Sequence, residues 1–419
     1  MLDILKKIEE FEYNIQPRMN KLYEYYIGKQ DILKAHKPEG KPNNKIVTNY
    51  ARNIVDTTTG YYLGIPITYS SEDEDLSKNV SHIIEYNDDA FHNVRLGKDI
   101  SVFGHSVELL YIDNDGEIRY GKINPMNVYV KYTDDIEQNI EYAIRWYDTT
   151  DDNDVKTRHI EYYTDKAVDY YTSSGGSLVH IETKENLFGM VPVNVFQNND
   201  DNLSDYEDAI PLFDAYNVMQ SESVNDFQKF ADALLAIKNT VVDDETASQM
   251  RDKNILELMD NGEASWLVKQ VNDAYVENIK NRLEKDIYMA TATVNISDDN
   301  FANNASGVAI KYKLARMENR ISRTERYFKK ALQRRFEMIC NVLNFKGGNF
   351  NYTDIDISFS RNIPANTQEL ASEIQQMSGL VSQRTLLKRL PFIDDVDEEI
   401  TQLQKEQDFD ILGGGGNEE

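Results

Sequence analysis

The sequence predicts an α+β protein in which helices predominate and an antiparallel sheet fills one continuous stretch. Apolar residues recur at spacings of three and four in segments near both ends of the chain, which is the spacing of helices that bury one face. Between residues 105 and 196 the spacing changes to two and hairpin signals occur, which is typical of antiparallel strands. At about 150 residues per domain, the 419 residues suggest two or three folded units.

Before residue 105 the sequence predicts three helices and one short strand. Each helix carries apolar residues on one face, as Leu5, Ile8 and Phe11 do in the first. A basic loop that contains prolines and a Gly-Ile-Pro turn separate these helices. The predicted segments are a helix over 5–15, a loop over 29–45, a helix over 46–61, a turn and strand over 63–69 and a helix over 76–103.

The stretch 105–196 is predicted to be one antiparallel sheet that is rich in tyrosine. Segments 113–116 (DNDG) and 173–176 (SSGG) are its clearest hairpin signals. We interpret the tyrosines as residues of a half-buried sheet face, because β-propensity explains them better than an aromatic ligand cage does. The first hairpin resembles the start of a calcium loop, but position twelve is Asn124 where a bidentate Glu is required, so we expect a plain turn.

Long helices dominate the rest of the chain. Ser204 and Glu207 have the spacing of a capping box, which opens a helix that we expect to reach Lys238 with Pro211 in its first turns. A helix over 306–345 would span about 60 Å, far more than an average helix, which points to a structural role. The other expected segments are strands at 240–244 and 265–269 around a helix at 247–259, a helix over 274–292, a loop over 295–305, a strand at 355–359 that returns to the sheet, and helical structure over 366–408.

Composition excludes several classes of function. The chain carries 45 Lys and Arg against 72 Asp and Glu, and its formal net charge of −27 argues against an ordinary DNA-binding domain and against an anionic membrane as partner. A single cysteine, Cys340, excludes a disulfide framework and a zinc site built from several cysteines. We find no apolar run near the roughly 20 residues of a transmembrane helix, and the amphipathic start is unlike a signal peptide, so a soluble cytosolic product is expected.

Motifs for catalysis are scarce. The sequence has neither a Walker-type glycine loop nor a G-x-S-x-G elbow, and its six histidines show no metal-binding spacing. Asp354 and Asp356 form a D-x-D, and a strand would place both carboxylates on one face. Two-metal nucleases use such carboxylate pairs. Because such a pair is expected by chance among 72 acids, we predict no enzyme activity, no metal and no cofactor, with a metal-dependent nuclease as the alternative.

The helix over 306–345 reverses the charge of the chain locally. Ten bases lie between 311 and 335 against only two acids. Such a face suits either nucleic acid or an acidic surface on a neighbouring subunit. We favour the neighbour, because a strongly negative chain that assembles with itself needs complementary patches. The residues assigned to this inter-subunit face, mostly opposite the apolar stripe, are Arg316, Arg320, Arg323, Arg326 and Lys330.

Several short segments follow one another in an order that is specific as a set. They are YYIGKQDI at 25–32, NY at 49–50, IVD at 54–56, GY at 60–61, GIPI at 64–67, FGH at 103–105, GMVPV at 189–193, NN at 198–199, SDYE at 204–207, DAYN at 214–217 and NASGVA at 304–309. Over nearly the whole chain this order resembles the portal proteins of tailed double-stranded-DNA bacteriophages, in the siphovirus branch with long non-contractile tails.

The resemblance implies a ring, usually of twelve subunits, at one capsid vertex, through which DNA is packaged and later ejected. Its expected partners are further copies of the chain, double-stranded DNA without sequence preference, the terminase large subunit, major capsid and scaffolding proteins, and the head–tail adaptor. No membrane is expected. The protein would be part of the virion and would assemble in the cytoplasm of the host bacterium. A different head or adaptor protein without a DNA channel is the remaining alternative.

The resemblance also implies a mainly helical ring-forming fold with long stem and tunnel helices, an antiparallel β-rich wing and a small α/β clip. The implied segments are a wing over 1–203, a stem helix over 204–238, a clip over 239–271, a second stem helix over 272–294, a tunnel loop over 295–305, a long helix over 306–345, a wing return strand over 346–363, a helical and reduced crown over 364–410 and a flexible tail over 411–419. The clip residues expected to meet terminase and adaptor are Asp243, Asp244 and Trp266.

The tunnel loop is expected to line the DNA channel. A channel must let DNA slide, so weak hydrogen bonds and local negative charge are favourable there. The acidic chain therefore excludes tight DNA binding but suits a conduit. The N-terminus of the helix that follows could touch phosphate transiently. The residues assigned to the loop are Asn295, Ile296, Ser297, Asp298, Asp299, Asn300, Asn303, Asn304 and Ser306.

Overall fold

The computed structural model describes residues 4–152, 154–174, 176–231, 234–239, 248, 261–267, 273–295, 307–362, 374–387, 396 and 399–405. The chain forms two compact units, one made of residues 1–293 and 317–360 and the other of residues 294–316 and 361–419. Helices and antiparallel sheets are both present, so the predicted α+β class is confirmed.

Five helices precede the two main sheets of the first unit. They are α1 (Ile4–Asn14), α2 (Gln16–Tyr26), α3 (Tyr50–Leu63), α4 (Glu74–Tyr86) and α5 (Asp89–Phe103), with a 3-10 turn η1 (Asp31–Lys34) after α2. The stripe predicted for the first helix is buried at Ile8 and Phe11, but Ile15 is 40% exposed and separates α1 from α2. Pro17 starts a new helix there, because a proline is well tolerated in a first turn that needs no N–H donor.

The single helix predicted over 76–103 is wrong, because this stretch forms the two helices α4 and α5. Asn87 caps α4 by donating from Nδ2 to the Ile83 carbonyl oxygen at 2.8 Å. Asp88 then adopts a left-handed backbone with φ of 50°, which interrupts the helical path. Apolar residues keep helical spacing on both sides of the break, so periodicity alone did not reveal it.

Residues 105–197 form two antiparallel sheets where one was predicted. One has three strands in the order β3-β2-β9 and the other has five in the order β4-β5-β6-β7-β8. The predicted hairpins are both confirmed, since β2 pairs with β3 and β7 pairs with β8. The strands are β2 (His105–Ile112), β3 (Ile118–Ile123), β4 (Val128–Tyr132), β5 (Ile140–Thr150), β6 (Lys156–Tyr163), β7 (Ala167–Ser174), β8 (Ser177–Glu185) and β9 (Val193–Gln197).

The five-stranded sheet has apolar partners on both faces. One face shares a core with the three-stranded sheet, to which Val107, Val193 and Tyr163 contribute. The other face packs against α1, where Trp146 meets Phe11 edge-on with 5.4 Å between the ring centroids. Most tyrosines of the sheets lie in or against these two cores, as expected for half-buried sheet residues.

Helix α6 (Ile210–Ala231) follows the predicted capping box, with one 3-10 turn, η3 (Glu207–Ala209), in between. Ser204 Oγ accepts from the Tyr206 N–H at 3.3 Å, and Pro211 lies in the first turn of α6. The helix ends earlier than Lys238, because β10 (Leu234–Lys238) pairs there with β11 (Glu263–Leu267). The strand predicted at 240–244 and nearly all of the helix at 247–259 lie outside the described residues.

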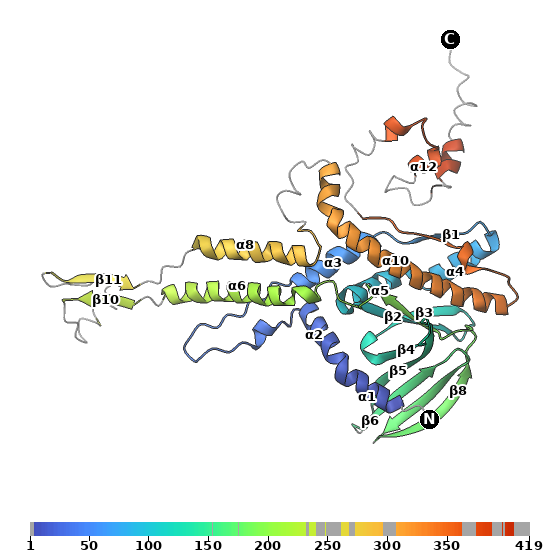
Figure 1. Ribbon diagram of the computed structural model, residues 1–419, viewed down its shortest axis with the longest axis horizontal. Coiled ribbons are helices and arrows are strands. Elements are labelled where there is room, and N and C mark those ends of the chain that lie inside the picture. The colour runs from blue at the N-terminus through green and yellow to red at the C-terminus, as the bar shows by residue number, and fades with distance from the viewer. Residues whose placement is uncertain are drawn as a thin grey trace, which may run out of the picture. The chain divides into compact units, whose positions relative to one another are not determined.

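Helix α8 (Asp273–Ala290) confirms the second long helix and lies beside α6 (Figure 1). A further segment, residues 44–48, runs along α6, and we call it the strap. Asn217, Ser221 and Asn225 are spaced four residues apart on α6 and are at most 1% exposed. Their side-chain oxygens accept from the main-chain N–H groups of Thr48, Ile46 and Asn44 at 2.9, 3.0 and 2.8 Å. Ile46 therefore belongs to the strap, and α3 starts later than predicted, at Tyr50.

The long helix predicted over 306–345 is confirmed as α10 (Gly307–Phe345), with 39 residues. Its buried stripe in the first unit comprises Met317, Ile321, Phe328, Leu332, Phe336, Ile339 and Val342. The single cysteine, Cys340, lies on α10, is 2% exposed, and has its pKa raised to about 11 by burial.

After α10 the chain passes through η4 (Tyr352–Asp354) into β12 (Asp356–Ser358). This strand pairs with β1 (Thr68–Ser70), so the prediction that it returns to the main sheet is wrong. In the second unit the structure describes the short helix α12 (Gln383–Leu387), while much of the helical segment predicted over 366–408 lies outside the described residues. No helix among the described residues is both long and apolar enough to cross a membrane.

Candidate functional site: helix α10 and its pocket

The bases of α10 lie in different environments, although the sequence suggested one solvated face. Arg316, Arg323, Arg326 and Lys330 are exposed, whereas Arg335 is 1% exposed. Arg335 lies on the apolar stripe, three residues after Leu332 and four before Ile339. That position was the signal in the sequence that Arg335 is buried, and it was missed.

Arg335 is the centre of a buried charged cluster. Its Nη1 donates to Asp89 at 2.8 Å, and its Nε and Nη2 donate to Glu108 at 3.0 and 2.6 Å. Asn93 accepts from Nη2 at 3.1 Å, and His92 Nε2 lies 2.7 Å from Glu108 Oε2. None of these side chains is more than 5% exposed. The cluster joins α10 to α5 and β2.

Charge compensation favours the ionised forms of Glu108 and Arg335. Burial would raise the pKa of the Glu108 carboxyl, but Arg335 and the His92 hydrogen bond outweigh it and lower that pKa to about 2. Burial would lower the pKa of Arg335, but the carboxylates of Glu108 and Asp89 outweigh it and raise the pKa above its ordinary value. Because every charged group has a partner and solvent is excluded, we assign the cluster a structural role: it fixes α10.

Arg320 also has its partners within the chain, which the sequence did not predict. It forms an ion pair with Asp205, whose side chain is 3% exposed, and donates to Thr58 Oγ1 at 2.7 Å. In the first unit, Arg323, Arg326 and Lys330 remain exposed and form no ion pair with any side chain that the structure describes. We call these three residues the basic ridge.

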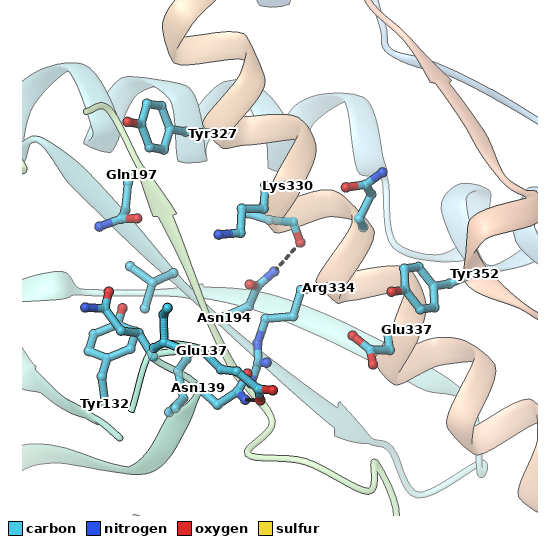
Figure 2. A pocket seen from close by; sticks show the side chains of 16 residues that line it. Tyr132, Glu137, Asn139, Asn194, Gln197, Tyr327, Lys330, Arg334, Glu337 and Tyr352 are labelled. Carbon is cyan, nitrogen blue, oxygen red and sulfur yellow. Dashed lines mark hydrogen bonds between the residues drawn. The ribbon is translucent and has the colours of Figure 1, made fainter. Parts of the chain in front are cut away.

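A pocket of about 520 Å³ lies at the end of the basic ridge (Figure 2). Lys330 belongs to both features. The pocket is bounded by α10, by β9 and by the loop between β4 and β5. Its lining includes Lys330, Arg334 and Glu337 of α10, Asn194 and Gln197 of β9, and Tyr132, Glu137 and Asn139 from the end of β4 and the loop.

Most residues assigned to the tunnel loop and clip lie outside the described part of the chain. Asn295 is described and lies in the irregular segment after α8, whereas the others from Ile296 to Ser306 are not described. Asp243 and Asp244 also lie outside it. Trp266 lies on β11, where its backbone pairs with Leu235 of β10.

Only one of the two aspartates of the D-x-D motif lies in the predicted strand. Asp354 belongs to η4 and only Asp356 belongs to the strand β12, although both are exposed. Within the described ranges, no group of three or more His, Cys, Asp or Glu side chains is arranged to hold a metal ion. The nuclease alternative therefore gains no support from this part of the chain.

Comparison with known proteins gives matches over almost the entire length. A family model described as phage portal protein, SPP1 Gp6-like, matches residues 5–411. The portal protein of Bacillus phage SPP1 is 24% identical, over 94% of this chain and 84% of that protein. The portal protein of Clostridium phage phiCD119 is also 24% identical, over 89% of both chains. The similarity thus includes both sheets, α6, α8 and α10.

Proposed function

The chain belongs to the SPP1 Gp6-like family of phage portal proteins, and we propose that copies of it form the ring at one capsid vertex through which DNA enters and leaves the head. The observation that carries this conclusion is the family match over residues 5–411, and the resemblance inferred from the ordered motifs is confirmed by it. As a portal protein, the chain is a structural component of the virion. We expect twelve copies in the ring, assembled in the host cytoplasm.

Imaging the purified full-length protein by negative-stain electron microscopy tests this proposal. The expected result is a ring with a central hole of about 20 Å or more, wide enough for a B-form duplex. A compact monomer at every protein and salt concentration would contradict it. DNA hydrolysis by the isolated protein that is lost in Asp356→Asn would instead support the nuclease alternative.

We assign α6 and α8 to the stem and the β10–β11 pair to the clip. Support comes from their order: α6 leads within three residues into β10, and β11 leads within six residues into α8. The two helices lie side by side (Figure 1) and the two strands pair antiparallel, as expected for a segment that runs out along α6 and returns along α8. The clip then begins at Leu234. The clip is where we expect the terminase large subunit, and later the head–tail adaptor, to bind.

We assign residues 295–305 to the tunnel loop that faces DNA. They lie between α8 and α10, so in a ring they connect the stem to the long helix. Asp298 and Asp299 would keep phosphates from being held, because a carboxylate near a phosphate repels it.

The double variant Asp298→Lys and Asp299→Lys tests the tunnel loop. It should still form rings but should package DNA poorly, because two lysines per subunit would hold the phosphate backbone. Packaging is measured as DNA protected from nuclease inside capsids. The control, Glu182→Lys with Glu185→Lys on the exposed strand β8, changes the net charge equally and should package normally. Normal packaging by the tunnel-loop variant would refute the assignment.

We further propose that the basic ridge contacts the neighbouring subunit. Three exposed bases lie within eight residues of one helix and form no ion pair in the described part of the chain, although the protein has a net charge of −27. In a ring, the neighbour presents a mostly acidic surface to them. The wing around the ridge is also where we expect major capsid and scaffolding proteins to bind.

A further inference from the structure

Two residues that line the pocket at the end of the basic ridge each have a buried polar atom without a hydrogen-bond partner among the described residues. Arg334 donates from Nη2 to the Val191 carbonyl oxygen at 3.2 Å, but its Nε has no hydrogen-bond partner anywhere in the described residues. The same is true of Asn194 Oδ1. One atom is a donor and the other an acceptor. An unpaired buried polar atom costs about 1–3 kcal/mol, so a bound molecule that pairs either atom would gain stability from it.

The orientation of the Asn194 amide follows from its neighbours. Nδ2 donates to the Ala331 carbonyl oxygen at 2.9 Å and to Glu108 Oε1 at 3.3 Å, so Oδ1 must be the atom without a donor (Figure 2). Glu108 is itself held by Arg335. Asn194 is 0% exposed, and these two contacts fix the orientation of its amide.

Charged side chains in the pocket are also without close counter-ions. No ion pair within 4.0 Å is formed, among the described residues, by four charged side chains of the lining: Lys330, Arg334, Glu137 and Glu337. Among these residues Glu137 accepts a hydrogen bond only from Asn139, at 2.8 Å. Burial lowers the pKa of Arg334, with Glu337 acting in the opposite direction. The pocket thus has two basic side chains that can donate further hydrogen bonds and two acidic side chains that can accept them.

This set of groups favours a polypeptide over nucleic acid as the occupant. Asn194 Oδ1 needs an N–H donor, which a polypeptide backbone supplies and a phosphodiester does not. An acidic side chain, in contrast, could accept from Lys330 and Arg334 while its main chain donates to Asn194.

We propose that an acidic segment of a second copy of this chain occupies the pocket, with a carboxylate between Lys330 and Arg334 and a main-chain N–H donated to Asn194. The proposal rests on the ring of the proposed function. A second copy is favoured because the chain has 72 acids against 45 bases and because the pocket continues the basic ridge. In a head-to-tail ring every copy can give one segment and receive one.

Site-specific photo-crosslinking in full-length rings tests this occupant. The photoreactive residue p-benzoylphenylalanine replaces Gln333, which is exposed and lines the pocket. Irradiation should give covalent dimers and longer ladders, and mass spectrometry should place the cross-link in a segment rich in Asp and Glu. Adding Arg334→Glu should lower the cross-link yield at least fivefold. Because Arg334 is half-buried, Lys330→Glu at an exposed position replaces it where the change at Arg334 impairs folding, with the same expected loss. The charge-matched Lys78→Glu on α4 should leave the yield unchanged.

The possible failures of this experiment are distinct from a failure of the proposed function. The pocket proposal would be overturned if rings are imaged but no intermolecular cross-link forms, or if Lys330→Glu leaves the cross-link yield unchanged. Neither result would contradict the proposed ring. Cross-links in infected cells to DNA or to a different protein, and none between copies, would overturn the second copy as occupant. Absence of any ring in the unmodified protein would overturn the proposed function itself.

Discussion

Arg335 has the residue type of an exposed helix face and the position of a core residue. As one of ten bases along α10, Arg335 is expected to have an exposed side chain. Its spacing from Leu332 and Ile339, however, predicts that the side chain lies on the buried stripe. Its two carboxylate partners, Asp89 and Glu108, lie 246 and 227 positions away in the sequence. The burial of Arg335 could therefore be predicted from the sequence, but its partners could not, because helical spacing carries no information on distant contacts.

Replacing Arg335 with methionine should lower the free energy of unfolding by about 3–5 kcal/mol, because two carboxylates stay buried without their cation. Arg323→Met on the exposed side of the same helix should change it by less than about 0.5 kcal/mol. Chemical denaturation followed by tryptophan fluorescence measures both. Equal effects of the two variants would contradict the role assigned to the cluster.

The same variant should reverse the pH dependence of stability. In the native chain Arg335 holds the Glu108 pKa at about 2, below its ordinary 4.5, so this stabilising contribution is complete above pH 4.5 and is lost as the pH falls towards 2. Without Arg335, burial of Glu108 is opposed only by the His92 hydrogen bond, and the Glu108 pKa should rise. The variant should then gain stability on acidification from pH 7 to 5, where the native protein does not. A parallel decline of both proteins would argue against this.

Gly104 and Gly116 allow a matched test of backbone strain, since their φ angles are 85° and 81°. An added Cβ at Gly104 would lie 1.8 Å from the Asn202 carbonyl oxygen, whereas at Gly116 nothing lies within 4 Å. Gly116→Ala should cost about 1–2 kcal/mol, the usual penalty for a left-handed alanine. Gly104→Ala should cost more than about 4 kcal/mol, because backbone must move. Thermal unfolding measures the difference, and similar midpoints for the two variants would refute it.

At the scale of elements, periodicity located α10 and α8 well because long, strongly periodic helices carry a redundant signal. It failed where one residue changes the backbone path, as Asp88 does between α4 and α5. It also failed at β10, where pairing with β11 overrides local propensity. The strap was missed because its binding groups on α6 are polar. Three polar residues at a spacing of four are as regular as an apolar stripe, and this pattern could have indicated a buried polar contact.

Asn217→Ala should release one end of the strap. The change leaves the Thr48 N–H and the Gln30 side chain without their Asn217 partner inside the protein, at a cost of about 1–3 kcal/mol. Hydrogen exchange of the strap amides, measured by mass spectrometry, should become at least tenfold faster. Val218→Ala on the exposed side of α6 is the control and should leave exchange unchanged. Unchanged exchange in Asn217→Ala would show that other contacts hold the strap.

At the scale of the whole molecule, net charge was informative about function only in combination with the family. A charge of −27 excludes a tight DNA-binding domain, yet it is compatible with a protein that lets DNA pass. The ordered motifs predicted the portal family, while the pocket and the cluster could not be predicted because both bring together residues from distant segments. For the candidate site, the sequence correctly indicated exposed bases at Arg316, Arg323, Arg326 and Lys330.

Ring assembly should depend on the basic ridge through electrostatics. The double variant Arg323→Glu and Arg326→Glu should shift the protein from rings to smaller species at low salt, because in the proposed interface it would place acid against acid. The control Lys6→Glu with Lys78→Glu changes net charge by the same amount on exposed positions elsewhere. Sedimentation velocity at about 0.1 M and 1 M salt measures both, since screening at high salt should reduce the difference. Identical behaviour of the two double variants would remove the ridge from the interface.

Cys340 makes the chain convenient for spectroscopic labelling. It is the single cysteine, it is buried within α10, and its pKa of about 11 leaves almost no reactive thiolate near pH 7. A fluorophore maleimide should therefore not react with the native protein, and it should label only a cysteine introduced at a chosen surface position. Donor and acceptor dyes placed in this way on separate copies would report distances between subunits by energy transfer, with every native residue of the core left in place.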